Sequence, residues 1–212
     1  GHEFTTNFDG TLYTFICLQN KTITPTSGST FLFDDLDIYQ GQLSTDVYRY
    51  NGQIANQRFA VLNANVDTST ITINIISNNL VTAWTHAKDL TSITTTSTVF
   101  YIQENDDGLF EIYFGDDIIG VKVDDGNLIV VSYLVSSGAI ANNMGQLDNA
   151  NSRAFSYRSG DTVEVVSASA GGAERETKLS IRNNAPKSYQ AQDRAVTTDD
   201  FKSILARDYP DM

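Results

Sequence analysis

Short apolar runs, separated by clusters of Asp, Asn and Gly, occupy most of the chain up to Val135. The run 12–18 is compact and rich in β-favouring side chains, which predicts a strand that is buried on both faces or nearly so. Residues 30–33 and 46–50 are further strand candidates, and the Asn51-Gly52 turn signal follows them. This pattern predicts a body built mainly from β-strands.

Three pairs of runs predict antiparallel hairpins with regular spacing. In the first pair, Ile71, Ile73 and Ile75 alternate with polar residues, which predicts one buried face. The other two pairs turn at Asp-Gly sequences, where Gly accepts a positive φ and the Asp side chain bonds to its own backbone. The predicted pairs are 59–66 with 71–76, 98–103 with 109–114, and 118–123 with 127–135.

The remaining stretches give weaker patterns. Residues 84–93 are mixed and are interpreted as coil, 136–151 as a loop and 162–168 as a strand. Residues 173–182 contain helix formers. This predicted helix must end before Pro186, because the residue before a proline avoids the α region.

A second short helix is predicted near the C-terminus. Thr197 is placed as its N-cap, Asp200 can reach back to the backbone N–H of Thr197, and Val196 with Phe201 forms a hydrophobic staple. A helix of about ten residues does not persist alone. Its apolar face, with Phe201 and Leu205, must therefore be buried against another surface.

Two blocks of sequence, in matched order, cover about half of the chain and together resemble a known family. The first has Ala185-Pro186, Tyr189, Gln192, Arg194-Ala195-Val196-Thr197 and Asp200-Phe201; the second has Val99–Glu104, Asp107-Gly108, Glu111–Asp116, Gly120, Gly126-Asn127, Tyr133 and Ala141-Asn142. This pattern resembles the baseplate wedge proteins of contractile-tailed (T-even-like) bacteriophages, which are related to the baseplate J family. One position departs from it: Asp117 stands where the resemblance predicts a second glycine, so the geometry of that turn is open.

The resemblance implies a structural, non-enzymatic protein of the virion tail baseplate, assembled in the host bacterial cytoplasm. Such proteins form dimers and a ring around the tail hub, and they contact other baseplate wedge and hub proteins. The ring takes part in the rearrangement that triggers sheath contraction. The alternative is a receptor-binding, glycan-binding or glycan-cleaving tail module on the same β body.

Together these patterns predict a mainly β (α+β) fold. An antiparallel β-meander or sandwich-like body is expected at 5–144, and a small C-terminal α/β module with two short helices at 145–212. The segment Gly1–Phe4 has the composition of a cloning remnant and is excluded from the predicted fold. The missing start methionine and the ending at Asp211-Met212 predict a fragment of a longer protein.

Composition excludes several classes of function. The net charge is −12, from 14 Lys+Arg against 26 Asp+Glu, and would repel a phosphate backbone, so no nucleic-acid partner is expected. No apolar run approaches the roughly 18 residues of a membrane helix, so no membrane partner is expected either. Cys17 is the single cysteine, which excludes an intrachain disulfide and a cysteine-based zinc site.

The candidates for catalytic residues are one histidine and a set of paired carboxylates. His86 lies in no serine-elbow context, so we favour a structural histidine over a triad base. Glu104, Glu111 and Asp116 are candidates for the two acids of a glycosidase. We favour the alternative that Glu104 and Glu111 face solvent on opposite strands of one hairpin and that Asp116 shapes a turn, because nothing fixes a cleft.

Clustered acidic residues raise the question of calcium, which prefers oxygen ligands. No run matches the twelve-residue calcium loop with its final glutamate, so turn chemistry is favoured. Gly171-Gly172 before a predicted helix suggests anion binding, but no P-loop spacing follows, and a hinge is favoured. No metal and no cofactor are therefore predicted. The acidic candidates are Asp34, Asp35, Asp37, Asp106-Asp107 and Asp124-Asp125.

The C-terminal tract is the candidate interface. Arg194 precedes the capped helix and can pair with a local carboxylate or with one on a neighbouring chain; only a desolvated pair across an interface would contribute much to binding. The aromatic residues of the tract fit an intrachain core or an interface about equally. The candidate residues are Pro186, Tyr189, Gln192, Arg194, Val196, Thr197, Asp200, Phe201, Leu205 and Tyr209.

Overall fold

The structure is a computed structural model in which the chain divides into two compact units, Gly1–Gly172 and Ala173–Met212. The predicted domain boundary after residue 144 stays a prediction. The structure describes residues 2–22, 31–33, 35–88, 90–145, 147–148, 151–152, 155–157, 161–191, 197–198, 201–202 and 204–205.

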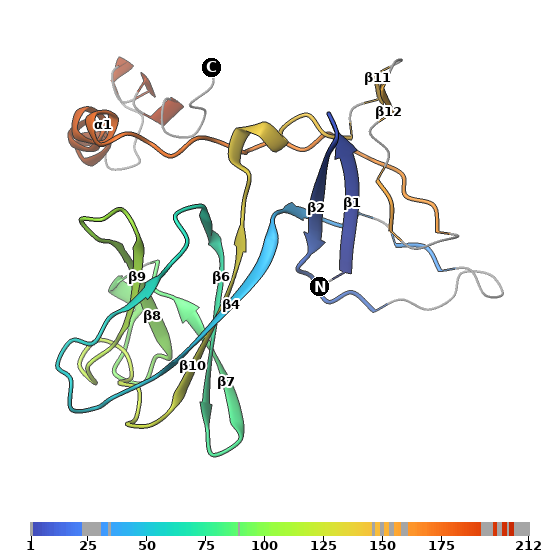
Figure 1. Cartoon of the computed structure of the whole chain (residues 1–212). Helices are drawn as coiled ribbons and strands as arrows, with labels where there is room; N and C mark the ends of the chain where they lie inside the picture. Colours follow the sequence, from blue (N-terminus) through green and yellow to red (C-terminus); the bar gives the residue numbers. More distant parts are fainter. Residues whose placement is uncertain are drawn as a thin grey trace. The chain divides into compact units, whose positions relative to one another are not determined.

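A seven-stranded sheet dominates the first unit, and its strand order is β4-β10-β6-β7-β8-β9-β5 (Figure 1). All neighbours pair antiparallel except β7 and β8, which pair in parallel. The predicted mainly β fold is thereby confirmed. The strands are β4 (Gln42–Arg49), β5 (Phe59–Val61), β6 (Val66–Ser77), β7 (Leu80–His86), β8 (Val99–Glu104), β9 (Phe110–Phe114) and β10 (Leu128–Val135).

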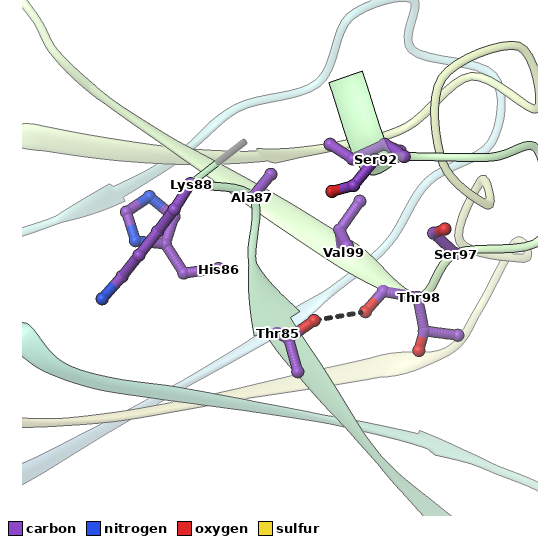
Figure 2. Close-up of a pocket in the computed structure, with 9 residues that line it drawn as sticks. Thr85, His86, Ala87, Lys88, Ser92, Ser97, Thr98 and Val99 are labelled. Carbon is purple, nitrogen blue, oxygen red and sulfur yellow. Dashed lines mark hydrogen bonds between the residues drawn. The ribbon is translucent and has the colours of Figure 1, made fainter. Parts of the chain in front are cut away.

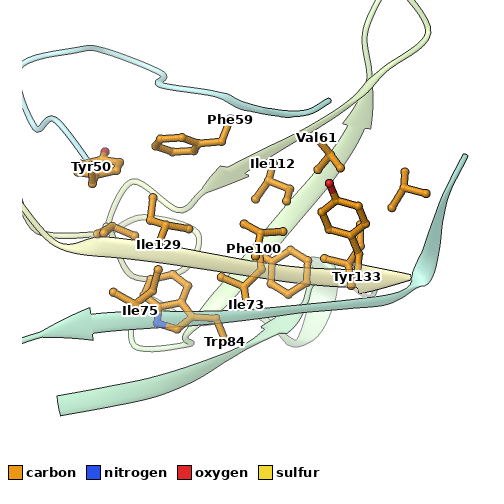
Figure 3. Close-up of a cluster of buried hydrophobic side chains, with 14 residues drawn as sticks. Tyr50, Phe59, Val61, Ile73, Ile75, Trp84, Phe100, Ile112, Ile129 and Tyr133 are labelled. Carbon is orange, nitrogen blue, oxygen red and sulfur yellow. The ribbon is translucent and has the colours of Figure 1, made fainter. Parts of the chain in front are cut away.

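The sheet curls around one hydrophobic core (Figure 3). The two outer strands β4 and β5 both contribute to this core, and the hydroxyl of Tyr48 on β4 donates to the carbonyl of Ala60 on β5 at 2.8 Å. This hydrogen bond links β4 and β5, the two edge strands of the sheet. The buried side chains of the core are Tyr50, Phe59, Val61, Val66, Ile71, Ile73, Ile75, Trp84, Phe100, Ile112, Val123, Ile129, Val131 and Tyr133.

A three-stranded sheet of order β1-β2-β3 belongs to the same unit, with β1 (His2–Phe8), β2 (Thr11–Cys17) and β3 (Tyr39–Gln40). Asp9 and Gly10 join β1 to β2 with φ of 51° and 78°, the conformation that a two-residue hairpin turn requires. The excluded segment 1–4 therefore supplies part of a strand, and its Phe4 is buried. The second core cluster contains Phe4, Phe15, Cys17, Ala141, Met144 and Phe155.

The strand 12–18 was predicted to be buried on both faces or nearly so. This prediction is wrong for the first half of the strand. Leu12 is exposed, whereas Phe15 and Ile16 are buried. The three-stranded sheet packs only one end of β2 against the second core cluster.

The three predicted hairpins have different outcomes. The β8–β9 hairpin is confirmed, with Gly108 at φ 80° in its turn. The pairing of 59–66 with 71–76 is wrong, because β5 pairs with β9 and β6 pairs with β7 and β10. The third is also wrong: residues 118–123 form no strand, and β10 lies between β4 and β6.

Several other element predictions are wrong. Residues 31–33 and 162–168 are irregular, and the stretch 84–93 begins inside strand β7. The sequence signal for β7 was the Asn78-Asn79 turn, whose φ values of 49° and 64° suit a tight hairpin. The short elements are the 3-10 helices η1 (Leu90–Ser92) and η2 (Gly138–Ala141) and the two-residue strands β11 (Leu147–Asp148) and β12 (Asn151–Ser152).

The second unit contains helix α1 (Lys178–Ala191), which runs through Pro186. The prediction of a helix over 173–182 that ends before Pro186 is therefore wrong at both ends. Thr177 starts α1, because its hydroxyl accepts the backbone N–H of Ser180 at 3.2 Å. The second predicted helix stays a prediction: the N–H of Phe201 donates to the carbonyl of Thr197 at 3.1 Å, which is one helical turn.

Candidate functional site

The predicted interface tract lies in the second unit, and its described apolar side chains are exposed. Tyr189 on α1 is 80% exposed and Phe201 is 54% exposed; Leu205 and Leu179 are also exposed. Large apolar side chains that are exposed in this way are typical of a protein–protein interface. Pro186 lies within α1 and Thr197 is exposed, whereas Gln192, Arg194, Val196, Asp200 and Tyr209 lie outside the described residues.

His86 lies at the end of β7 beside a hollow of about 460 Å³. Its imidazole stacks on the ring of Phe100 at 5.4 Å, and burial, followed by the nearby Lys88, lowers its pKa. In Figure 2 the imidazole lies beside Lys88 and apart from Ser92 and Ser97, which line the other part of the hollow. His86 is thus an exposed residue whose ring stacks on Phe100, and the structural interpretation of this histidine stays a prediction.

Glu104 and Glu111 do not form a catalytic pair. In the β8–β9 ladder Glu111 lies opposite Gln103, and Glu104 lies opposite Phe110. Because successive residues of a strand point to opposite faces, the two carboxylates project from opposite faces of the hairpin. Two acids in this arrangement cannot flank one glycosidic bond.

Glu111 instead belongs to a cluster around Arg58, which sequence reasoning missed. The guanidinium of Arg58 lies 3.5 Å from the Glu111 carboxylate, donates to the side chain of Gln103 at 2.9 Å and lies 4.8 Å from the centre of the Tyr113 ring. The pair is partly exposed, so it stabilises the fold by about 0–1 kcal/mol. No local sequence signal joins Arg58 to the β8–β9 hairpin, because β5 pairs with β9 only in the folded sheet.

A second hollow, of about 440 Å³, lies beside this cluster and is lined by Tyr50, Tyr113 and Phe114 together with residues 52–58. Aromatic side chains at this place would favour the glycan-binding alternative. However, the ring of Tyr113 stacks with Tyr101 at 5.1 Å and also carries the guanidinium of Arg58. The ring of Tyr113 thus already contacts two groups, and a sugar that stacked on it would compete with them.

Asp116 shapes a turn, as predicted. Its carboxylate accepts the backbone N–H groups of Ile118 and Ile119 at 3.0 and 3.1 Å, and these bonds lower its pKa. The next residue, Asp117, has φ of 69° and accepts the N–H of Lys122 at 2.8 Å. The turn therefore has the left-handed conformation that the family glycine would adopt, and here an aspartate adopts it.

Two of the other acidic candidates also use their carboxylates as hydrogen-bond acceptors. Asp125 accepts the N–H of Gly52 at 2.8 Å, and Asp37 accepts the side-chain amide of Gln19 at 2.8 Å. Within the described part of the chain, no three His, Cys, Asp or Glu residues are grouped to hold a metal ion. Asp34 lies outside that part.

The glycine pair is held tightly. Gly172 donates to the side-chain carbonyl of Asn142 at 2.8 Å and accepts from its amide at 2.7 Å, and a Cβ at Gly172 would lie 2.4 Å from the carbonyl oxygen of Gly138. The hinge interpretation stays a prediction: these contacts fasten Gly172 to the first unit, and the division between the two units falls directly after it. Helix α1 begins at Lys178, so the pair is not at a helix N-terminus.

None of the helices in the described part of the chain has the length and hydrophobicity that a membrane span needs.

Comparison with known proteins finds a match that covers most of the seven-stranded sheet. Residues 45–137, less than half of the chain, match the family profile of the bacteriophage baseplate wedge protein gp6, third domain, and this range runs from β4 to just after β10. The chain is also 27% identical over 144 residues to baseplate wedge protein gp6 of Enterobacteria phage T4. This match covers 58% of the present chain. The match spans 22% of the length of that relative. These comparisons confirm the resemblance that the two sequence blocks predicted, and they place the chain among proteins similar to the baseplate wedge protein of T4-like bacteriophages, a structural component of the virion tail.

Proposed function

We propose that this chain acts in a phage tail baseplate wedge through contacts between subunits, and that it performs no reaction. In this proposal the chain forms homodimers, joins a ring around the tail hub and contacts other wedge and hub proteins. The ring changes its arrangement when the sheath contracts. The observation that carries the proposal is the exposure of Tyr189, Phe201 and Leu205 among the described residues of the second unit.

The proposed interface is a two-fold contact between C-terminal tracts. Burial of one large apolar side chain contributes roughly 2–3 kcal/mol, so three exposed side chains in one tract supply a substantial driving force for association. A two-fold contact uses the same patch on both subunits. Arg194 completes the proposed patch as a partner for a carboxylate of the second copy.

The double variant Phe201→Asp, Arg194→Ala tests this interface. We expect it to weaken self-association in sedimentation velocity while the β-sheet signal in circular dichroism stays unchanged. Leu62→Asp is the matched control, because Leu62 is also highly exposed but follows β5 in the first unit. An unchanged oligomer for the double variant would contradict the proposed interface. Titration of the same protein with bacterial surface glycans tests the alternative function.

A further inference from the structure

A side-chain amide joins two parts of the first unit that lie 30 positions apart in the chain. Asn142 directly follows η2, and its amide N–H donates to the carbonyl of Gly172 at 2.7 Å, while its side-chain carbonyl accepts the N–H of the same residue at 2.8 Å. A primary amide presents a donor beside an acceptor, as the main chain does. These two bonds therefore hold Gly172 in the way that one rung of an antiparallel ladder holds a strand.

Ser169 adds four hydrogen bonds to this contact. Its N–H donates to the carbonyl of Met144 at 2.9 Å, and its carbonyl accepts the N–H of Asn143 at 2.7 Å. Its hydroxyl accepts the N–H of Met144 at 2.9 Å and donates to the carbonyl of Ala141 at 2.6 Å. Among the described residues, the four bonds of Ser169 and the two of Asn142 thus join the same two segments, and we call this set the asparagine clasp.

The asparagine clasp leaves no room for a side chain at position 172. A Cβ on Gly172 would lie 2.4 Å from the carbonyl oxygen of Gly138 and 2.8 Å from the side-chain oxygen of Asn142. The first of these contacts is to the main chain, which cannot turn aside as a flexible side chain could. Glycine permits this close approach of two backbones, and a larger residue would open the clasp.

One side of the clasp is fixed to both sheets of the first unit. Two residues link β10 to η2, and the side-chain carbonyl of Gln40 on β3 accepts the N–H of Ser137 at 2.8 Å and the hydroxyl of Ser136 at 3.2 Å. Ala141 and Met144 are buried in the second core cluster. The chain around η2 is therefore a firmly held continuation of β10, which lies between β4 and β6 in the large sheet.

The clasp bypasses the chain between its two sides. Within the described part of residues 145–168, the regular structure consists of the two-residue strands β11 and β12 and one isolated β-bridge. Val163 and Val165 pack on the second core cluster but are only partly buried. The division between the two units falls directly after Gly172. A force on the second unit therefore reaches the clasp before it reaches this stretch.

We propose that the asparagine clasp is the mechanical attachment of the second unit to the seven-stranded sheet. While the clasp is closed, a pull on Ala173 acts on η2 and β10 through Asn142. When the clasp opens, the chain between Asn142 and Gly172 extends by up to about 100 Å, at roughly 3.3–3.6 Å per residue, and the pull reaches β10 only once that chain is extended. This device goes beyond the proposed function, because it operates whichever partner the second unit binds.

Single-molecule pulling tests the attachment. One handle is placed at Thr82→Cys, an exposed position on β7, and the other at Met212→Cys. The natural Cys17 is buried, so it stays unlabelled. As the force rises, the second unit should extend first, and a separate gain of up to about 100 Å should follow when the clasp opens.

Three variants should move this event to a clearly lower force. Asn142→Ala removes both side-chain bonds, and Asn142→Asp keeps the volume but replaces the donor. Gly172→Ala opens the clasp from its other side. Asn63→Ala is the matched control, because its side chain also accepts a main-chain N–H in the first unit but lies outside the clasp, and it should leave the force of this event unchanged.

Amide hydrogen exchange gives a second readout of the same variants. In the parent, the N–H groups of Ser169 and Gly172 should exchange more slowly than the N–H of Ala173. In Asn142→Ala the N–H of Gly172 should exchange roughly tenfold or more faster, as loss of its acceptor and of the neighbouring bond requires. Unchanged protection of the N–H groups in β6 and β10 shows that the variant is folded.

The outcomes separate this inference from the proposed function. An opening force that is the same in the parent and in Asn142→Ala, or a Gly172 N–H that exchanges as fast as that of Ala173 in the parent, overturns the mechanical role of the clasp. Because both measurements follow the clasp within one molecule, that failure leaves the two-fold contact standing. Equally, an unchanged oligomer for Phe201→Asp, Arg194→Ala contradicts the two-fold contact and leaves the clasp standing.

Discussion

The hydroxyl of Thr70 accepts the backbone N–H of Leu134 at 3.0 Å and donates to the carbonyl of Asp67 at 2.8 Å. The ladder between β6 and β10 is interrupted here, because Ser132 pairs with Thr72 whereas Leu134 pairs with Asp67. A buried side-chain oxygen thus takes the place of a main-chain acceptor. The β6 strand bulges at this point without leaving the Leu134 N–H unsatisfied.

Thr70→Val should destabilise the first unit by about 1–3 kcal/mol, because the buried N–H of Leu134 loses its acceptor while the volume of the side chain is kept. Urea unfolding followed by tryptophan fluorescence of Trp84 measures this loss. Thr72→Val is the matched control on the exposed face and should change the free energy of unfolding by about 0.5 kcal/mol or less. Equal effects of the two changes would contradict a special role for Thr70.

Thr6→Val should have the opposite outcome. Thr6 is 2% exposed, and its hydroxyl has no hydrogen-bond partner among the described residues. Replacement by the isosteric valine removes a buried unsatisfied polar group, so the free energy of unfolding should stay unchanged or increase. A loss comparable to that of Thr70→Val would show that the hydroxyl has a partner.

Tyr48 should ionise at higher pH than an ordinary tyrosine, and stability at alkaline pH should depend on it. Burial and the nearby Asp46 raise the pKa of Tyr48 to about 12. The folded state thus favours the neutral phenol. The contribution of Tyr48 to the free energy of unfolding is therefore fully present below the unfolded pKa of about 10, and it is lost as pH rises toward 12. In a tyrosinate absorbance titration, Tyr48→Phe should remove one tyrosine from the late phase. A titration curve that loses an early-ionising tyrosine instead would contradict this assignment.

Asp117, the non-glycine residue with a positive φ in the loop 115–122, gives a graded series of variants. Asp117→Gly relieves the positive φ but loses the bond to the Lys122 N–H, so its stability should stay within about 1 kcal/mol of the parent. Asp117→Ala loses the bond and keeps the strain, which costs about 1–2 kcal/mol more than glycine. Thermal unfolding ranks the three proteins. An alanine variant as stable as the glycine variant would contradict the observed φ.

Pro186→Ala should stabilise helix α1 against thermal unfolding. A proline inside a helix removes one hydrogen bond and crowds the carbonyl four residues earlier, here that of Arg182, at a cost of up to about 3 kcal/mol. Far-ultraviolet circular dichroism should therefore show more helix at elevated temperature. Asn183→Ala on the same helix should add less than about 1 kcal/mol. If both changes act equally, Pro186 does not strain α1.

Local signals predicted local structure well and distant pairing poorly. The alternation of Ile71, Ile73 and Ile75 predicted their buried face, and Asp107-Gly108 predicted the β8–β9 turn. Asp125-Gly126 looked the same in sequence, but there it ends a loop before β10. Which strands become neighbours depends on contacts between residues far apart in the chain, and no single sequence records those.

The candidate site shows the same difference between local features, which the sequence predicts, and long-range contacts, which it does not. The turn role of Asp116 was predictable, because an aspartate can bond to N–H groups two and three residues ahead. The cap by Thr177 was also present in the sequence, but the avoidance of helix before Pro186 received too much weight. The cluster of Arg58 with Glu111 was not predictable, because it depends on the pairing of β5 with β9.

The position of β10 has a consequence for synthesis. It is the last strand of the large sheet to leave the ribosome, yet it lies between β4 and β6, and β4 has β10 as its hydrogen-bonded neighbour in that sheet. In a nascent chain that has reached only the loop 115–122, the edges of β4 and β6 that β10 later covers are therefore unpaired. Such edges invite pairing with other chains, and closing this long-range pairing late makes folding slow. Protection of these edges during translation should therefore limit the yield of folded protein.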